Sequence, residues 1–518
     1  MSSADEAVLA SLGYKQELKR EFSPWELFGI GFSIIGLFPS IASVLIYAIP
    51  NGGASAMIWG WTVCVIFLAF IVLALAELGS AAPTSGGLYY WTHSFCSPRY
   101  KNILSWVVGY SNTIGNIAGV ASVDWGFAVQ LMAAASIGSG MTFVPTTGQT
   151  YAVYALVLII HATVCSVAVK YIARLQIIYA ILNVLLCLGI IIGLPAATPS
   201  EFRNTAKYAF GDFENFYGWP NGFAFILSFL APLWTVGGFD ASVHISEEAT
   251  NASIAVPWAL LSAVFIASVL GWAINVAIAF NMGTDLDAIL SSPTGQPMAA
   301  ILFNSFGQRG TLAVWAIVVA VQFMMGMGII TVCSRQIFAF ARDGGLPFSH
   351  YLRRVNKHTA TPIYAVWFTA FISLLLGLLA FTGAQAIGAI FSLVIAGQYV
   401  AYAIPISARF LGKNDFRRGP FHLGVFSGPV ALVAVTWMAF MLVVFFFPTT
   451  VDPMASTMNY TVVVWGGVIL LSLAYYFFPV YGGRYWFKGP VRTLEESEGS
   501  VGGSRQSTLE DEKKQAED

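Results

Sequence analysis

Long apolar segments alternate with short polar segments along the chain from residue 25 to residue 479. A helix that crosses a hydrocarbon core of about 30 Å needs about 20 mostly apolar residues, and the pattern predicts twelve such helices. The expected spans are 25–49, 54–78, 101–130, 151–169, 175–194, 222–244, 256–282, 311–334, 362–382, 384–408, 428–448 and 459–479. We therefore expect an all-α integral membrane protein with twelve transmembrane helices.

Two of these spans contain residues that a uniform membrane helix avoids. The sixth span reads LWTVGGFDASVHISEE and holds Trp234, Thr235, Gly237, Gly238 and Asp240. Each glycine lowers helix propensity by about 1 kcal/mol relative to alanine, and a carboxylate at membrane depth is costly unless it faces protein or water. We predict a broken helix that lines a cavity; the alternative is an ordinary helix with Asp240 at the membrane surface.

The first span reads GIGFSIIGLFPS near its middle and predicts a second break. Gly36 weakens the helix, and Pro39 removes a backbone donor and clashes with the preceding turn. A proline kink without a ligand would explain the same residues. If the break is real, we expect the residues around it to border a substrate. They are Ser33, Ile35, Gly36 and Ser40.

The first and sixth spans are five helices apart, and this spacing predicts two five-helix halves in inverted orientation. Interrupted helices at matching positions of two halves indicate a transporter binding site near the bilayer midplane. A half-helix that begins there exposes N–H groups and a positive dipole end, which suit a carboxylate. A half-helix that ends there exposes carbonyls, which suit an ammonium group. The pattern therefore predicts a site for a zwitterion.

The expected organisation follows from the spans. It comprises a cytoplasmic arm (1–24), a first repeat (25–194), an external loop (195–221), a second repeat (222–408), two additional helices (409–479) and a cytoplasmic tail (480–518). Alternating charges in the arm fit a short helix or a disordered segment equally well. The tail, rich in Glu, Ser and Lys, is expected to be disordered.

Charge and composition fix the environment and the side of the membrane. The chain of 518 residues is 57% hydrophobic and 10% charged, whereas soluble domains carry about 25% charged residues. With cytoplasmic termini, all but three of the 25 Lys and Arg residues lie on the cytoplasmic side, which Lys and Arg favour. The exceptions are Arg203, Lys207 and Arg309. We expect the plasma membrane, with the vacuole or another internal membrane as the alternative.

Composition also limits the chemistry. The five cysteines show neither a CxxC pair nor the spacing of a metal site, and the sequence shows no cluster of His, Asp or Cys at one depth of the membrane. We therefore expect no enzyme, no metal, no cofactor and no nucleic-acid partner. The first 24 residues lack the apolar core of a cleavable signal peptide.

Further polar residues are candidates for the site. We expect Gln322 to contact substrate and Glu77 to be a candidate for proton coupling. Asp124 could face the cavity as a third proton-coupling candidate, but a position near external water is the preferred interpretation. For His161, hydrogen-bonded packing is preferred over a proton relay. Residues 244–248 are expected at the cytoplasmic exit, where charges need no partner.

Four motifs resemble those of the amino acid–polyamine–organocation superfamily of secondary transporters. They are FSIIGLFPS, ELGSAAPTSGGLYYW, GFDASVHISEEATNASIAVP and SRQIFAFARDGGLP. Within this superfamily the chain is similar to the amino acid/choline transporter branch, which fungal GABA permeases typify. The resemblance implies a five-plus-five inverted repeat with broken helices 1 and 6, followed by two extra helices. It also implies a substrate between spans one and six, with contributions from spans three, eight and ten.

The resemblance implies roles for two residues, and the chain differs from the family's motifs at two places. Trp234 matches an aromatic residue that closes over substrate, and Asp240 matches a carboxylate tied to proton-dependent transport in some bacterial relatives. Gly36-Leu37-Phe38-Pro39-Ser40 replaces a Gly-Ser-Gly-type turn in span one, and span five lacks the lysine of some proton-coupled relatives.

We therefore expect a secondary transporter that moves amino acids, with GABA or a related small zwitterion as substrate, by alternating access. Proton coupling through Asp240 or Glu77 is the preferred hypothesis. The expected partners are a small-molecule substrate, a co-transported proton and membrane lipid. Alternatives are uptake of choline, a polyamine or a vitamin precursor by the same fold, or a nutrient sensor. An aromatic cage would favour choline; its candidates are Phe38, Trp234, Phe239 and Phe323.

Overall fold

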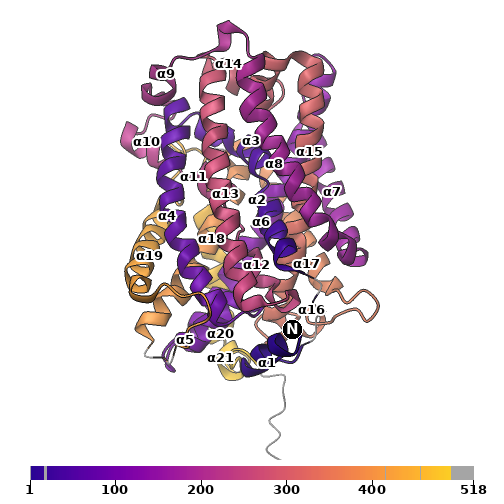
Figure 1. Cartoon of the computed structure of the whole chain (residues 1–518), viewed down its shortest axis with the longest axis vertical. Helices are drawn as coiled ribbons and strands as arrows, with labels where there is room; N and C mark the ends of the chain where they lie inside the picture. Colours follow the sequence, from indigo (N-terminus) through magenta and orange to yellow (C-terminus); the bar gives the residue numbers. More distant parts are fainter. Residues whose placement is uncertain are drawn as a thin grey trace, which may run out of the picture.

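The computed structural model describes residues 2–16, 20, 22–412, 414, 416–455 and 457–491. Over these residues the chain is helical and contains isolated β-bridges but no named strand. The long helices run side by side along the long axis of the molecule (Figure 1). The predicted disordered tail beyond residue 491 lies outside the described residues, and so do positions 17–19 and 21, which include three of the alternating charges of the arm.

The long helices follow the predicted apolar segments. They are α2 (Pro24–Ile35), α3 (Leu37–Ala48), α4 (Gly53–Ala81), α6 (Lys101–Gly138), α7 (Thr147–Val167), α8 (Val169–Ala197), α13 (Ala252–Asn281), α15 (Pro297–Arg342), α17 (Ile363–Leu376), α18 (Ala384–Leu411), α19 (Ser427–Val444) and α20 (Thr461–Phe477). The short α10 (Asn221–Leu227), α11 (Leu230–Thr235) and α12 (Ala241–His244) occupy the sixth predicted span. Short helices outside the spans are α1 (Ser2–Ser11), α5 (Gly87–Phe95), α9 (Ala206–Gly211), α14 (Leu286–Leu290), α16 (Ser349–Leu352) and α21 (Gly483–Trp486).

The all-helical membrane fold is confirmed. Within the described residues, ten segments are long and apolar enough to cross a membrane. Shorter apolar helices, Asn221–Thr235 and Thr461–Phe477, lie at the sixth and twelfth predicted spans. The count of twelve, the inverted repeat and the orientation remain predictions.

Two helices are longer than the apolar pattern indicated. α15 begins at Pro297, not near residue 311, and a non-helical Gly307 (φ 65°, ψ 179°) interrupts it. Proline is favoured at the first position of a helix because its fixed φ fits and its missing N–H would have no partner there. α6 continues to Gly138 beyond the expected end at residue 130. Side chains expected at external helix ends are therefore placed deeper in the bundle.

Small residues let α6 and α18 approach closely. A Cβ atom added at Gly397 would lie 2.7 Å from the Ser111 carbonyl oxygen and 2.8 Å from the Gly115 Cα. Small residues at helix contacts are a common way to bring membrane helices together. The contact is between two backbones, so no side chain can move to make room.

The first prediction concerns this contact. Gly397→Ala is expected to destabilise the protein by about 1–3 kcal/mol, because overpacking forces the helices apart. Thermal unfolding of the detergent-purified protein measures the effect. Gly428→Ala is the matched control, since a Cβ at Gly428 would meet nothing within 4 Å. Equal unfolding temperatures for the two variants would contradict the prediction.

The N-terminal arm packs against one end of the bundle, where α5, α16 and α21 also lie (Figure 1). The arm is helical at Ser2–Ser11, whereas most of the alternating charges further on lie outside the described residues. The Asp5 carboxylate accepts hydrogen bonds from the backbone N–H groups of Asn251 (2.7 Å) and Ala252 (3.2 Å). Tyr14 is buried and its hydroxyl donates to Asp343 at 3.3 Å. These residues of the arm are therefore held against the bundle by hydrogen bonds.

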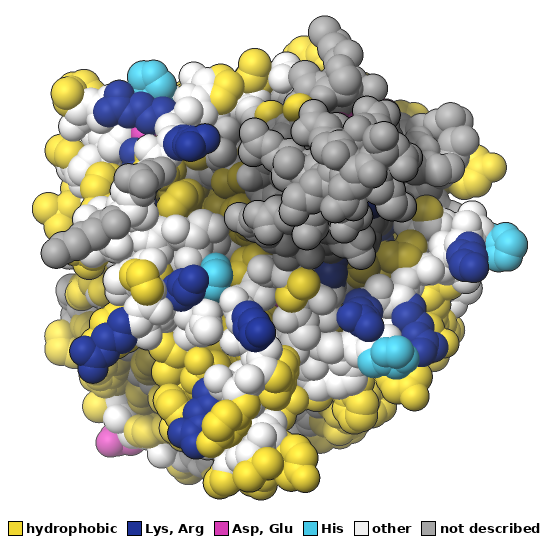
Figure 2. Space-filling view, turned by 90° about the horizontal axis from the view of Figure 1, so that it is seen from below, with side chains coloured by type: hydrophobic (Ala, Val, Ile, Leu, Met, Phe, Trp, Pro, Cys, Tyr) yellow, Lys and Arg dark blue, Asp and Glu magenta, His cyan; other side chains and the backbone are white. Residues whose placement is uncertain are grey.

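Figure 2 views this end of the molecule and shows Lys and Arg side chains spread over it, with few acidic ones. Arg353, Arg354, Arg417 and Arg418 are exposed. An excess of basic residues on one side is the pattern that cytoplasmic loops show. That this end faces the cytoplasm stays a prediction.

Candidate functional site

The first predicted break lies at Gly36 and is confirmed. α2 ends at Ile35, Gly36 adopts the left-handed conformation (φ 47°, ψ 54°), and α3 begins at Leu37. A Cβ at Gly36 would also lie 2.6 Å from the Met325 sulfur atom. The Ser40 hydroxyl donates to the Ile35 carbonyl at 2.7 Å. It thereby satisfies one carbonyl that the helix end leaves without an intrahelical partner.

The second break separates α11 from α12 and is also confirmed. α11 ends at Thr235, Gly238 has a φ of 73°, and α12 begins at Ala241. The Gly237 N–H donates to the Trp234 carbonyl at 3.0 Å, which closes the last turn of α11. Gly238 permits this conformation because glycine has no Cβ penalty at positive φ.

The two breaks meet in the interior of the bundle. A Cβ at Gly238 would lie 2.9 Å from the Ile34 side chain. α11 packs against α3, and α12 packs against α2. The helix ends at the two breaks therefore face one shared region, as the pairing of interrupted helices predicted.

Several polar atoms near these breaks are buried without a hydrogen-bond partner among the described residues, and three of them belong to predicted site residues. These three are Thr235 Oγ1, Asp240 Oδ2 and Gln322 Oε1. A buried polar group without a partner costs about 1–3 kcal/mol. A hydroxyl, a carboxylate oxygen and an amide oxygen offer one donor and several acceptors. A ligand with an ammonium and a carboxylate group would satisfy them together with the free groups of the helix ends.

Several predicted substrate residues form hydrogen bonds with neighbouring helices. The Ser33 hydroxyl donates to Gln176 Oε1 at 2.6 Å, so it faces α8. Gln322 Nε2 donates to the Val123 carbonyl at 2.8 Å. The Trp234 indole N–H donates to the Ser122 hydroxyl at 3.2 Å. Sequence reasoning missed Gln176, whose signal was an amide in a span that is otherwise apolar except for Asn183.

Glu77 is buried and forms an ion pair with Arg409. Arg409 Nη2 donates to Glu77 Oε1 at 2.9 Å, and the Ser427 hydroxyl donates to both carboxylate oxygens at 2.9 Å. The Leu423 backbone N–H adds a further bond at 3.3 Å. The pair joins α4 to α18 and α19. These contacts account for a buried charge at Glu77 without a transported proton.

Asp240 directly precedes α12 and lies beside His244, the last residue of that helix. Asp240 Oδ2 is 3.4 Å from His244 Nε2. His244 Nδ1 lies 3.1 Å from the Ser85 carbonyl oxygen, and His244 Nε2 lies 3.2 Å from Asn112 Nδ2. Both ring nitrogens of His244 are thus in contact with other groups, and the histidine is fully buried.

Asp124 is not near external water, and that interpretation is wrong. Its side chain is fully buried, and Oδ1 lies 3.0 Å from His161 Nδ1. Because α6 continues to Gly138, Asp124 sits within the helix, not at its end. A buried carboxylate needs a partner, and His161 on α7 supplies it. The hydrogen bond expected for His161 is therefore present, and the choice between a packing role and a proton relay stays a prediction.

The charges of residues 244–248 are also buried, contrary to expectation. Glu247 accepts hydrogen bonds from Thr84 Oγ1 (2.9 Å) and the Ser85 N–H (3.0 Å) and pairs with Arg342 at 3.3 Å. Burial acts to raise the pKa of Glu247, but Arg342 and these hydrogen bonds outweigh it and hold the pKa below its usual range. Glu248 pairs with the buried Arg335 at 2.9 Å. These ion pairs and hydrogen bonds hold the segment that follows α12 against the bundle.

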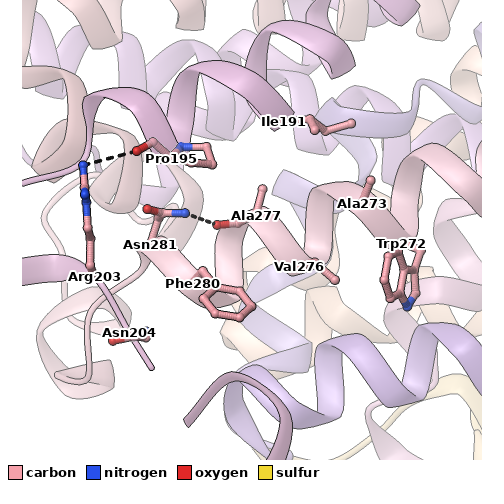
Figure 3. Close-up of a pocket in the computed structure, with 10 residues that line it drawn as sticks. All are labelled: Ile191, Pro195, Arg203, Asn204, Trp272, Ala273, Val276, Ala277, Phe280 and Asn281. Carbon is pink, nitrogen blue, oxygen red and sulfur yellow. Dashed lines mark hydrogen bonds between the residues drawn. The ribbon is translucent and has the colours of Figure 1, made fainter. Parts of the chain in front are cut away.

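A separate cavity of about 490 Å³ lies between the C-terminal halves of α8 and α13 (Figure 3). Its lining is mainly apolar, and the polar groups at its edge are turned to the backbone. Arg203, for example, donates to the carbonyls of Thr198 (2.9 Å) and Pro195 (3.3 Å). The cavity includes none of the predicted substrate residues, so it is distinct from the site at the two breaks.

Comparisons with known proteins place the chain among permeases. A family model described as amino acid permease matches residues 22–468. The chain is 38% identical to the GABA-specific permease of Saccharomyces cerevisiae over 500 residues, covering 95% of this chain and 87% of that protein. It is 38% identical to an uncharacterised amino-acid permease of Schizosaccharomyces pombe, covering 97% and 91%. It is 34% identical to amino-acid permease 2 of Neurospora crassa, covering 94% and 89%.

Proposed function

Since the chain belongs to the amino acid permease family and is an integral membrane transporter and not an enzyme, we propose that it carries GABA or a related small zwitterion. Transport proceeds by alternating access and is coupled to protons. The substrate lies between the two helix breaks. The protein has twelve transmembrane helices and cytoplasmic termini and resides in the plasma membrane.

One observation supports the substrate class above all. The breaks at Gly36 and Gly237–Gly238 bring interrupted helices together around three buried polar atoms without partners. A half-helix that starts at the breaks presents N–H groups to a carboxylate. Carbonyls, Gln322 Oε1 and Asp240 Oδ2 accept hydrogen bonds from an ammonium group. The similarity to a protein named GABA-specific permease supports GABA as the first substrate to test.

Uptake of radiolabelled GABA into vesicles that contain the purified protein tests the proposal. We expect saturable uptake that other small amino acids inhibit, that external acid stimulates and that sodium does not affect. A competition panel adds choline, polyamines and vitamin precursors. Sodium dependence without pH dependence would overturn proton coupling. Saturable uptake of choline or a polyamine in place of GABA would overturn the proposed substrate.

The second prediction tests Asp240. Asp240→Asn removes the negative charge beside the second break, and hydrogen bonds to charged groups contribute about 1.5–3 kcal/mol. The half-saturating GABA concentration is therefore expected to rise about tenfold or more, since 1.4 kcal/mol is a factor of ten. Asp452→Asn, at an exposed loop position, is the matched control. Unchanged affinity and pH profile in Asp240→Asn would remove this residue from the mechanism.

A further inference from the structure

A buried aspartate and histidine meet where α6 packs against α7. Asp124 and His161 are both fully buried. His161 Nδ1 lies 3.0 Å from one carboxylate oxygen of Asp124 and 3.2 Å from the other. A neutral imidazole carries its hydrogen on one nitrogen only. This geometry assigns the hydrogen to Nδ1, which donates it to the carboxylate.

The opposite nitrogen of His161 is free to accept a proton. Nε2 is buried and has no hydrogen-bond partner among the described residues. His244, the histidine beside Asp240, differs in this respect. Its Nδ1 contacts the Ser85 carbonyl at 3.1 Å, and its Nε2 contacts the Asn112 amide nitrogen at 3.2 Å. Of the two buried Asp–His pairs, therefore, Asp124–His161 has a ring nitrogen free to accept a proton, and Asp240–His244 does not.

We infer that Nε2 of His161 binds the co-transported proton and that Asp124 supplies the counter-charge. The inference rests on the proposed function. Without the proton the pair carries one negative charge, which is costly in a buried membrane site. With it, an imidazolium faces a carboxylate and the pair is neutral. One N–H bond forms when the proton arrives from water on one side, and the same bond breaks when the proton leaves to the other side.

One turn of α15 links this pair to the first helix break. A Cβ at Gly326 would lie 2.3 Å from His161 Cε1 and 2.4 Å from Asp124 Oδ1, so the α15 backbone lies against the pair. The adjacent Met325 lies against Gly36. A change in charge at the pair therefore acts on the same turn of α15 that contacts the break.

The same turn also reaches α6 beside Asp124. Gln322, four residues before Gly326, donates through Nε2 to the Val123 carbonyl. Its Oε1 is one of the unpartnered atoms near the substrate region. Substrate at Gln322 and a proton at His161 would thus both bias the position of α15, which is what coupled transport requires.

The other ionisable groups near the pair have partners of their own. The Tyr154 hydroxyl on α7 donates to the Ser373 carbonyl. The Cys165 thiol on α7 donates to the Met327 carbonyl at 3.5 Å. Arg335 on α15, which interacts with that thiol, pairs with Glu248 at 2.9 Å. Asp124 is therefore the charge that His161 contacts directly.

The test compares net proton movement with exchange in GABA-loaded vesicles. An inward gradient of one pH unit can drive about tenfold GABA accumulation if one proton moves with each molecule. In His161→Gln and in Asp124→Asn, we expect the GABA concentration inside the vesicles to reach only the external concentration. We also expect the external medium to show no rise in pH when GABA is added. Both variants should retain exchange of internal for external GABA, which needs a folded substrate site but no net proton movement. His350→Gln, at a cytoplasmic helix, is the matched control and should behave like the wild type.

The outcomes separate this inference from the proposed function. Proton movement and accumulation at wild-type levels in both variants would overturn the inference and leave the proposed function intact. Absence of saturable GABA uptake by the wild type would overturn the proposed substrate. If the single variants lose exchange as well, the double variant Asp124→Asn/His161→Gln, which keeps an amide–amide contact, is measured. Wild-type coupling in the double variant would likewise overturn the inference.

Discussion

Gly36→Val is expected to lower GABA uptake by about a hundredfold or more, because about 3 kcal/mol of local strain is a factor of more than a hundred in an equilibrium. Gly36 has a φ of 47°, and a residue with a Cβ pays about 1–2 kcal/mol in the left-handed region. The added side chain also meets Met325, 2.6 Å from the position of the Cβ. Overpacking of this kind costs a further 1–3 kcal/mol, roughly.

The strain acts at the first helix break, where we propose that substrate binds. Uptake and the thermal unfolding temperature are measured on the same preparation. Gly189→Val on α8 is the matched control, because a Cβ there meets nothing within 4 Å. Near-normal uptake by Gly36→Val would show that the left-handed conformation at this residue is not needed for transport.

Arg342→Ala is expected to destabilise the protein by about 3–5 kcal/mol, because it leaves a buried carboxylate without its opposite charge. Glu247 is 1% exposed and lies 3.3 Å from Arg342. The guanidinium also lies over the Tyr14 ring, 4.3 Å from its centroid, and so contacts the N-terminal arm. Thermal unfolding of the detergent-purified protein measures the loss.

Two further variants test whether the buried charge is the cause. The double variant Glu247→Gln/Arg342→Met removes both charges and is expected to recover most of the lost stability, since replacing a whole buried pair is often neutral. Arg353→Ala changes an exposed arginine and is expected to stay within about 0.5 kcal/mol of the wild type. Equal stability of Arg342→Ala and Arg353→Ala would contradict the prediction.

Local features of the chain determined the helices and their breaks. The length and apolarity of each segment depend on neighbours within one helix, so spans such as α13 and α18 follow the predicted ranges closely. Gly36 and the Gly237–Gly238 pair mark the breaks because glycine tolerates positive φ wherever it stands. The number of Lys and Arg residues in each loop can likewise be counted along the chain, and this count predicts the orientation.

Helix ends were predicted less well where the helix continues beyond its apolar segment. α15 begins at Pro297 and α6 continues to Gly138. Both helices therefore extend beyond their apolar segments. A polar residue can continue a helix outside the hydrocarbon layer, since the backbone hydrogen bonds do not depend on the side chain. Hydropathy therefore sets the spans but not the full helices.

The partners of the polar side chains were decided by tertiary structure alone. Asp124 and His161 are 37 residues apart, and Glu77 and Arg409 are 332 residues apart. No local pattern records which face of one helix meets which face of another. The sequence by itself determined a helical membrane transporter with two broken helices, because hydrophobic length and glycine act locally. Only packing decided that the carboxylates are buried and paired, because a buried charge is stable only where the fold brings a partner to it.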